Sequence, residues 1–221
     1  MAPRTTAPPN GKTLETIGGT SPTNDAEEAI LTGAPYVAHV TIEGTAALLF
    51  HRWSNEAVAE KAAAAKGSAA KKTDNVESYV YRDPDGQICL PGEYLRMALC
   101  FAAKYKQDPR SPRKSMMDMV KAGLVVITEL APMVSANTGR PTTDWDYLDE
   151  RRVMVQRAGV TRQRPAFTKG WRVEFDVLVN LPEYIPASVL RSLLYDAGRL
   201  VGVADFRPTY GRFDVVSFSV G

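Results

Sequence analysis

The segment from Val80 to Ala98, VYRDPDGQICLPGEYLRMA, constrains the fold of this chain more than any other stretch. An apolar-alternating segment passes through a tight polar turn into a second apolar segment, which leads directly into a helical pattern. Asp83-Pro84-Asp85-Gly86 supplies the turn, because proline fixes its own φ and glycine accepts a positive φ. Pro91 suits the first helical turn, where a missing backbone N–H costs nothing. The segment therefore predicts a β-hairpin that runs straight into a helix.

Hydrophobic periodicity predicts the other elements. In chain order these are a strand at 36–43, the helix after Pro91, a short helix at 116–121, a strand at 124–130, an irregular stretch at 132–150, two strands flanking a turn at 165–170, a helix around 189–197 and a last strand at 212–220. We expect Gly198 to end the second long helix in a left-handed cap. The order βα…ββ…αβ predicts an α+β fold of the ferredoxin-like type, which also underlies RNA-recognition (RRM-like) modules.

The length of 221 residues indicates one domain with insertions and a tail. Residues 1–34 are rich in Pro, Thr, Gly and Ala and are expected to form a flexible, disordered N-terminal arm. The domain is expected to span 35–221, with insertions at about 54–88 and 132–150. No apolar run is long enough to span a membrane, and no secretory signal is recognisable. Cys89 and Cys100 have no metal-like companions, so we expect no metal or cofactor and a reduced, cytoplasmic compartment.

Charge is distributed unevenly along the chain. Seven basic residues and no acidic ones lie between positions 151 and 172: Arg151, Arg152, Arg157, Arg162, Arg164, Lys169 and Arg172. Four acidic residues lie just before them: Asp144, Asp146, Asp149 and Glu150. This asymmetry predicts that the basic residues form a surface that faces a polyanion. For the four acidic residues, contact with the basic surface of a neighbouring subunit is favoured over Mg²⁺ binding. The alternative is a solvated basic hairpin without a partner.

The stretch from Gly198 to Phe213, GRLVGVADFRPTYGRF, combines glycines with arginines. Glycines such as Gly211 let a backbone approach phosphates closely. Arg199, Arg207 and Arg212 supply paired donors, and Tyr210 is suited to stacking on a base. The alternative is a helix C-cap followed by an ordinary glycine turn.

Two of these motifs together resemble the RAMP superfamily, the repeat-associated proteins of CRISPR effector complexes. In that family the first helix begins after a proline-glycine dipeptide, as at Pro91-Gly92. A glycine-rich loop before the last strand ends in a Gly-aromatic-Gly-basic pattern, where Tyr210-Gly211-Arg212 stands here. After this dipeptide the family usually has small residues and a lysine-glycine pair. Here these positions hold Glu93, Tyr94, Arg96 and Met97, and only Arg96 is basic.

Within the superfamily the chain most resembles the backbone subunits that polymerise along guide RNA in type I and type III effectors, or a phage or mobile-element relative of them. In type III versions an aspartate after the first strand cuts target RNA, but the segment 48–56, LLFHRWSNE, has no aspartate. The resemblance therefore implies a binder and not an enzyme. It also implies that the Ala- and Lys-rich stretch near Trp53 acts as a basic, thumb-like arm. For His51, packing or phosphate contact is favoured over acid–base catalysis.

The sequence therefore predicts a sequence-tolerant, non-catalytic protein that binds single-stranded nucleic acid, RNA before DNA. The resemblance implies that copies of the chain assemble into a homo-oligomeric filament and contact other effector subunits. It also implies a location in the cytoplasm of a bacterial or phage-infected cell, with no membrane partner. The predicted nucleic-acid-binding residues are His51, Arg52, Trp53, Arg96, Arg157, Arg162, Arg164, Lys169, Arg199, Arg207, Tyr210, Gly211 and Arg212. The alternative is a phage or mobile-element assembly protein that works through protein contacts. A metal-independent or Mg²⁺-dependent endoribonuclease is a third hypothesis.

Overall fold

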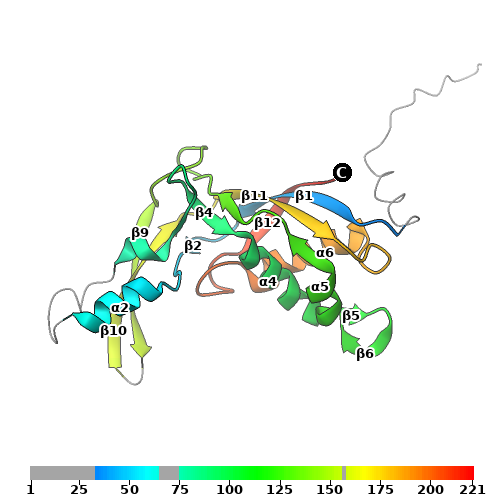
Figure 1. Ribbon diagram of the computed structural model, residues 1–221, viewed down its shortest axis with the longest axis horizontal. Helices are drawn as coiled ribbons and strands as arrows, with labels where there is room; N and C mark the ends of the chain where they lie inside the picture. The colour runs from blue at the N-terminus through cyan, green and yellow to red at the C-terminus, as the bar shows by residue number, and fades with distance from the viewer. Residues whose placement is uncertain (1–32, 65–74, 156–157) are drawn as a thin grey trace, which may run out of the picture.

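The computed structural model describes residues 33–64, 75–155 and 158–221. Its centre is a four-stranded antiparallel sheet in the strand order β12-β1-β11-β7 (Figure 1). The bounds of these strands are Phe213–Val220, Tyr36–Gly44, Arg172–Val179 and Leu124–Val126, respectively. Helices pack with this sheet, so the predicted α+β class is confirmed.

Alternation along β1 and β11 decides which face of the sheet is buried. Val40 of β1 lies opposite Phe175 of β11, and both side chains are buried. Their neighbours His39 and Asp176 lie opposite each other on the other face, where Nδ1 of His39 and Oδ1 of Asp176 are 2.6 Å apart. Successive strand residues point to opposite faces, so the pattern read from the sequence fixes this register.

Two amphipathic helices cover the buried face of the sheet. They are α4 (Gly92–Ala102) and α6 (Ala187–Asp196), which also contact each other. Leu95 and Leu99 of α4 and Leu190 and Leu194 of α6 join the same core as the inward residues of the strands. Along the chain the main elements follow the order β1, α4, β7, β11, α6, β12. The predicted helix after Pro91 is confirmed.

Three smaller sheets surround this centre. The predicted hairpin is formed by β3 (Tyr81–Arg82) and β4 (Ile88–Pro91), and β8 (Leu130–Pro132) pairs with β4. A second sheet has the order β2-β10-β9 and the bounds Leu48–Leu49, Ala158–Phe167 and Tyr147–Val155. The hairpin of β5 (Gln107–Asp108) and β6 (Ser111–Ser115) precedes α5 (Met117–Gly123).

The two predicted insertions contain regular structure. The first holds α2 (Asn55–Ala63) and the short helix η1 (Val76–Tyr79), and its residues 65–74 lie outside the described residues. Figure 1 places α2 and the β9–β10 hairpin at one end of the molecule and the β5–β6 hairpin at the other. The predicted N-terminal arm lies outside the described residues except for its last two positions. No helix in the described part of the chain is long and apolar enough to cross a membrane.

The structure corrects three predicted boundaries. The strand expected at 124–130 is two strands, because the chain leaves the central sheet after Val126 and pairs with β4 from Leu130 onward. The stretch expected to be irregular ends in a strand, since β9 begins at Tyr147. The turn expected from Pro165 begins only after Phe167. Pro165 is tolerated within β10 because its carbonyl accepts a hydrogen bond from the Phe50 N–H, so that the N–H that proline lacks is not needed for this contact.

The end of α6 also differs from the expectation. Gly198 does not form a left-handed cap; it lies within the short π-helix η3 (Ala197–Val201), which continues α6. A Cβ at this position would lie 2.0 Å from the carbonyl oxygen of Phe213, so Gly198 serves close packing against β12. The left-handed residue is Gly202, with a φ of +76°. It opens residues 202–212, called the glycine-rich loop below.

Candidate nucleic-acid interface

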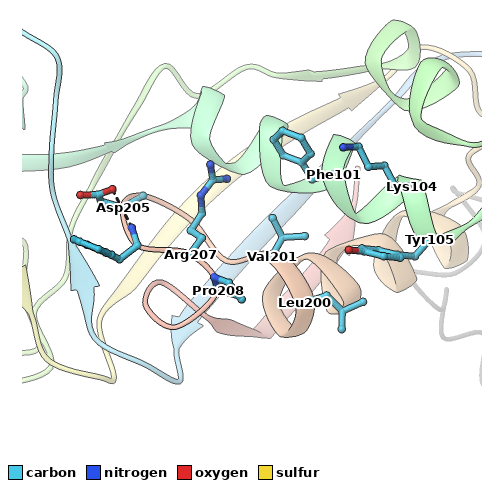
Figure 2. Close-up of a pocket in the computed structure, with 10 residues that line it drawn as sticks. Phe101, Lys104, Tyr105, Leu200, Val201, Asp205, Arg207 and Pro208 are labelled. Atoms are coloured by element: carbon cyan, nitrogen blue, oxygen red, sulfur yellow. Dashed lines mark hydrogen bonds between the residues drawn. The ribbon is translucent and has the colours of Figure 1, made fainter. Parts of the chain in front are cut away.

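Two adjoining pockets lie between α4 and the glycine-rich loop. The larger has a volume of about 460 Å³, and its walls include Phe101 and Lys104 (Figure 2). The smaller has a volume of about 310 Å³, and its walls include His51 and Tyr94. Three residues of the loop line both pockets: Ala204, Asp205 and Arg207. The two pockets therefore meet at Arg207, and together they are called the groove below.

The α4 side of the groove is one stripe of the helix and its short extension η2 (Ala103–Tyr105). Tyr94, Met97, Phe101 and Lys104 line it at spacings of three and four residues. Residues at this spacing share a helical face. Sequence reasoning followed only the neighbouring buried stripe and missed these four side chains. The buried stripe includes Leu95, Ala98 and Ala102, and the residue before each of them lines the groove. The helical spacing could therefore have identified these groove side chains.

Two cations of the groove share one aromatic ring. The Nζ of Lys104 lies 4.6 Å from the ring centroid of Phe101, and the guanidinium carbon of Arg207 lies 5.9 Å from it. Both distances are within the range of a cation–π contact. Both cations are exposed to solvent. The groove thus presents two positive charges, and the Phe101 ring contacts both of them.

The two carboxylates that line the groove are both engaged by arginines. Oε1 of Glu93 lies 3.1 Å from Nη1 of Arg96, and Oδ2 of Asp205 lies 2.7 Å from Nε of Arg164. Neither carboxylate forms an ion pair with Arg207 among the described residues. Arg96 and Arg164 therefore neutralise the acids of the groove, which leaves Arg207 and Lys104 available to an anion.

A tyrosine pair lies next to the smaller pocket. The rings of Tyr81 and Tyr94 meet edge to face with centroids 5.9 Å apart, and the Tyr94 hydroxyl donates to that of Tyr81 over 3.4 Å. Burial raises the pKa of Tyr94, so this hydroxyl stays protonated and neutral. Arg52 lies over the Tyr81 ring at 4.9 Å. The pair extends the aromatic surface of the groove toward β3.

The glycine-rich loop is held by backbone hydrogen bonds to the segment that contains β2. The Asp205 N–H donates to Leu49 O over 3.1 Å, and the Gly211 N–H donates to Ala47 O over 2.8 Å. The Val203 N–H donates to Gly211 O over 2.9 Å. These bonds fix the position of the loop and hence of Arg207. Gly211 is buried and uses both backbone groups within the protein.

A network of arginines and aromatic rings joins the loop to the β9–β10 hairpin. The Arg151 guanidinium lies 4.6 Å from the ring centroid of Tyr210 and donates hydrogen bonds to the Tyr210 hydroxyl and to Asp149. Its hydrogen bonds with Asp149 raise the pKa of Arg151. Arg164 lies over the Phe206 ring at 4.5 Å. Tyr210, predicted to stack on a base, thus already has a guanidinium on its ring, and the hairpin and loop form one connected unit.

This network supports a prediction on stability. Breaking a fully buried ion pair costs about 3–5 kcal/mol, and because Asp205 is one third exposed, we expect Asp205→Ala to cost about 2 kcal/mol. The cost arises because Arg164 is buried and its Nη1 already has no hydrogen-bond partner. Urea unfolding would measure it. The double variant Asp205→Ala/Arg164→Met should recover most of the loss, and a double variant less stable than Asp205→Ala would contradict this explanation.

The other predicted binding residues are divided between the groove and more distant positions. His51 lines the smaller pocket, and its ring centroid lies 4.7 Å from that of Tyr79. Trp53 is 72% exposed and donates a hydrogen bond from Nε1 to Asn55. Arg96 does not itself line the groove: besides pairing with Glu93, it donates to Lys121 O in α5 and to Leu124 O at the start of β7.

The remaining predicted residues do not line the groove. Arg199 pairs with Asp196 over 3.6 Å and lies over the Tyr195 ring at 5.6 Å. Three more lie on β10, on the following turn and just before β12: Arg162, Lys169 and Arg212. The side chain of Arg157 lies outside the described residues. The groove therefore collects only His51 and Arg207 from the predicted set, with Arg164 just behind it.

The acidic residues before the basic stretch have partners within the chain. Asp146 accepts hydrogen bonds from Ser135 and from the backbone and hydroxyl of Thr168. Asp149 pairs with Arg151. Among the described residues no three His, Cys, Asp or Glu side chains are grouped so that they could hold a metal ion. Asp146 and Asp149 therefore make contacts within the chain that hold the segments next to β9 and β10 in place.

Comparison with known proteins gives a structural match but no sequence match. No protein-family model and no curated protein matches the sequence. The fold is similar to that of a chain in the cryo-electron microscopy structure of the Type III-B Cmr-beta bound to cognate target RNA, with a TM-score of 0.50 and 9% sequence identity. The match covers 90% of this chain and 64% of that one, so this chain spans less than two thirds of its length. At this identity the likeness concerns the fold alone.

Proposed function

We propose that this protein binds single-stranded nucleic acid, with RNA preferred, along the groove between α4 and the glycine-rich loop. The observation that carries the proposal is the pair of exposed cations, Arg207 and Lys104, that both lie within cation–π distance of the Phe101 ring. The acids of the groove are neutralised by other arginines. Cations track phosphates and aromatic rings stack on bases of any identity, so such a groove is suited to sequence-tolerant binding.

We further propose that residues 35–221 form a ferredoxin-like, RAMP-related domain. The chain order β1, α4, β7, β11, α6, β12 with the sheet order β12-β1-β11-β7 supports this assignment. The segments 54–88 and 132–150 would then be insertions into the ferredoxin-like core. The structural likeness to a chain of the Type III-B Cmr-beta supports the same assignment.

The proposed role is that of a repeated, non-catalytic backbone subunit. It rests on the family resemblance of the two glycine-containing motifs and on the segment 48–56, which carries no aspartate. In the structure this segment forms β2 and the start of α2, and its one acid, Glu56, is exposed. Partners of such a subunit would be further copies of this chain and other subunits of an effector.

A salt titration tests the proposal directly. Affinity for a fluorescent oligouridine should fall steeply with salt, with a slope of log K against log salt steeper than about −1.4 if Arg207 and Lys104 each neutralise one phosphate. Fluorescence anisotropy from low to physiological salt would measure it, and oligodeoxyuridine as competitor would test the preference for the 2′-hydroxyl. Affinity that does not change with salt would contradict the proposal. RNA recovered after incubation with Mg²⁺ should be intact, and specific cleavage would overturn the non-catalytic role.

A further inference from the structure

The β5–β6 hairpin carries a group of cations just beyond the larger pocket. Residues 104–114, KYKQDPRSPRK, contain five basic residues and one acidic residue. Lys104 and Tyr105 of this segment line the pocket, and the hairpin follows directly after them along the chain. Figure 2 shows Lys104 and Tyr105 at the end of the pocket opposite Asp205. The hairpin therefore lies next to this end of the groove, where β6 contacts η2.

Two cations of the hairpin are neutralised within the protein. Nζ of Lys106 lies 2.9 Å from Oδ2 of Asp196, and this pair ties the hairpin to α6. Nη2 of Arg110 lies 2.8 Å from Oδ2 of Asp108, a buried carboxylate in the hairpin itself. These pairs fix the hairpin to the domain and use the nearby acids.

Two other cations are presented to solvent. Arg113 and Lys114 of β6 are exposed, and no carboxylate in the described parts of the chain forms an ion pair with either of them. Tyr105 is 71% exposed, lines the same pocket as Arg207, and belongs to η2, which β6 contacts. A large aromatic ring with that exposure has no role in the core. Exposed cations beside an exposed ring combine the two contacts that single-stranded nucleic acid offers, phosphate and base face.

We propose that the β5–β6 hairpin is a second nucleic-acid contact, in which Arg113 and Lys114 bind phosphates of the strand leaving the groove and Tyr105 stacks on one of its bases. The proposal rests on the function proposed above and extends it: the bound strand runs from the groove onto the hairpin. A rigid attachment through Lys106 and Asp196 would keep the two contacts at a fixed separation. The length of nucleic acid bound by one copy is then set by the hairpin and not by the groove alone.

The experiment compares a long and a short oligouridine with the full chain. For one of about 20 nucleotides, longer than most single binding modules cover, Arg113→Gln/Lys114→Gln should weaken binding about tenfold and reduce the salt slope by about 1.4. For one of about 4 nucleotides, which fits within the groove, affinity should stay unchanged. Tyr105→Ala should weaken binding to the long oligonucleotide without changing the salt slope. Arg140→Gln, at an exposed position between β8 and β9, is the matched control and should bind normally.

The outcomes separate this proposal from the one on which it rests. If the unaltered protein binds neither oligonucleotide, the proposed function fails, and the hairpin contact fails with it. If it binds and Arg207→Ala weakens binding, while Arg113→Gln/Lys114→Gln keeps full affinity and slope for the long oligonucleotide, only the hairpin contact is overturned. If that double variant binds RNA normally but no longer self-associates in sedimentation experiments, the hairpin is a protein interface, which also overturns the contact.

Discussion

The double variant Arg207→Ala/Lys104→Ala is expected to bind single-stranded RNA at least a hundredfold more weakly than the unaltered protein. A hydrogen bond to a charged group contributes about 1.5–3 kcal/mol, so the loss of two contacts costs about 3 kcal/mol or more, roughly a hundredfold in affinity. Both side chains are exposed, and neither forms an ion pair with a described carboxylate. The unfolding midpoint should therefore move little, since only the exposed cation–π contacts with Phe101 are lost. Fluorescence anisotropy at constant salt would measure the affinity.

Two controls make this result specific to the groove. Arg140→Ala removes an exposed arginine elsewhere and should change affinity by less than about twofold, as expected for a minor change in overall charge. Arg207→Lys keeps the charge but loses the fork of donors, so its salt slope should be normal and its affinity intermediate. If Arg140→Ala weakens binding as much as Arg207→Ala, the protein attracts RNA through its overall charge and the groove is not the site.

Much of the central fold was predictable because its signals are local. The alternation in β1 and β11 and the helical spacing of Leu95 and Leu99 follow from which face of each element is buried. The hairpin before α4 follows from turn chemistry within four residues. Pro165 shows the limit of this reasoning. A proline predicts a turn unless a partner strand uses only its carbonyl, and that partner, Phe50, lies more than a hundred residues earlier.

The site was less predictable because charge in a sequence does not reveal its partner. The sequence predicts phosphate contacts for Arg96 and Arg164, whereas the structure pairs their guanidinium groups with Glu93 and Asp205. Lys104 lines the groove, but nothing in its sequence context distinguishes it from other exposed lysines. An arginine beside a carboxylate in space is neutralised, whereas one without such a neighbour is available to a ligand. Only the fold distinguishes the two.

The glycines of the loop show the same limit and permit a decisive test. The sequence predicts that Gly211 lets the backbone approach a phosphate. In the structure its φ is +71°, and a Cβ would lie 1.8 Å from the carbonyl oxygen of Val203. The loop's own backbone therefore accounts for the glycine. A left-handed alanine costs about 1–2 kcal/mol and forced repacking about 1–3 kcal/mol, so we expect Gly211→Ala to lower the free energy of unfolding by about 3–4 kcal/mol.

Gly139 is the matched control for this substitution. Its φ is +65°, but nothing lies within 4 Å of the position that a Cβ would take. Gly139→Ala therefore carries only the conformational cost, about 1–2 kcal/mol. Urea unfolding of both variants isolates the steric part as the difference between them. If Gly211→Ala is no less stable than Gly139→Ala and yet fails to bind oligouridine, the glycine is needed for the approach of a phosphate, and the packing explanation is wrong.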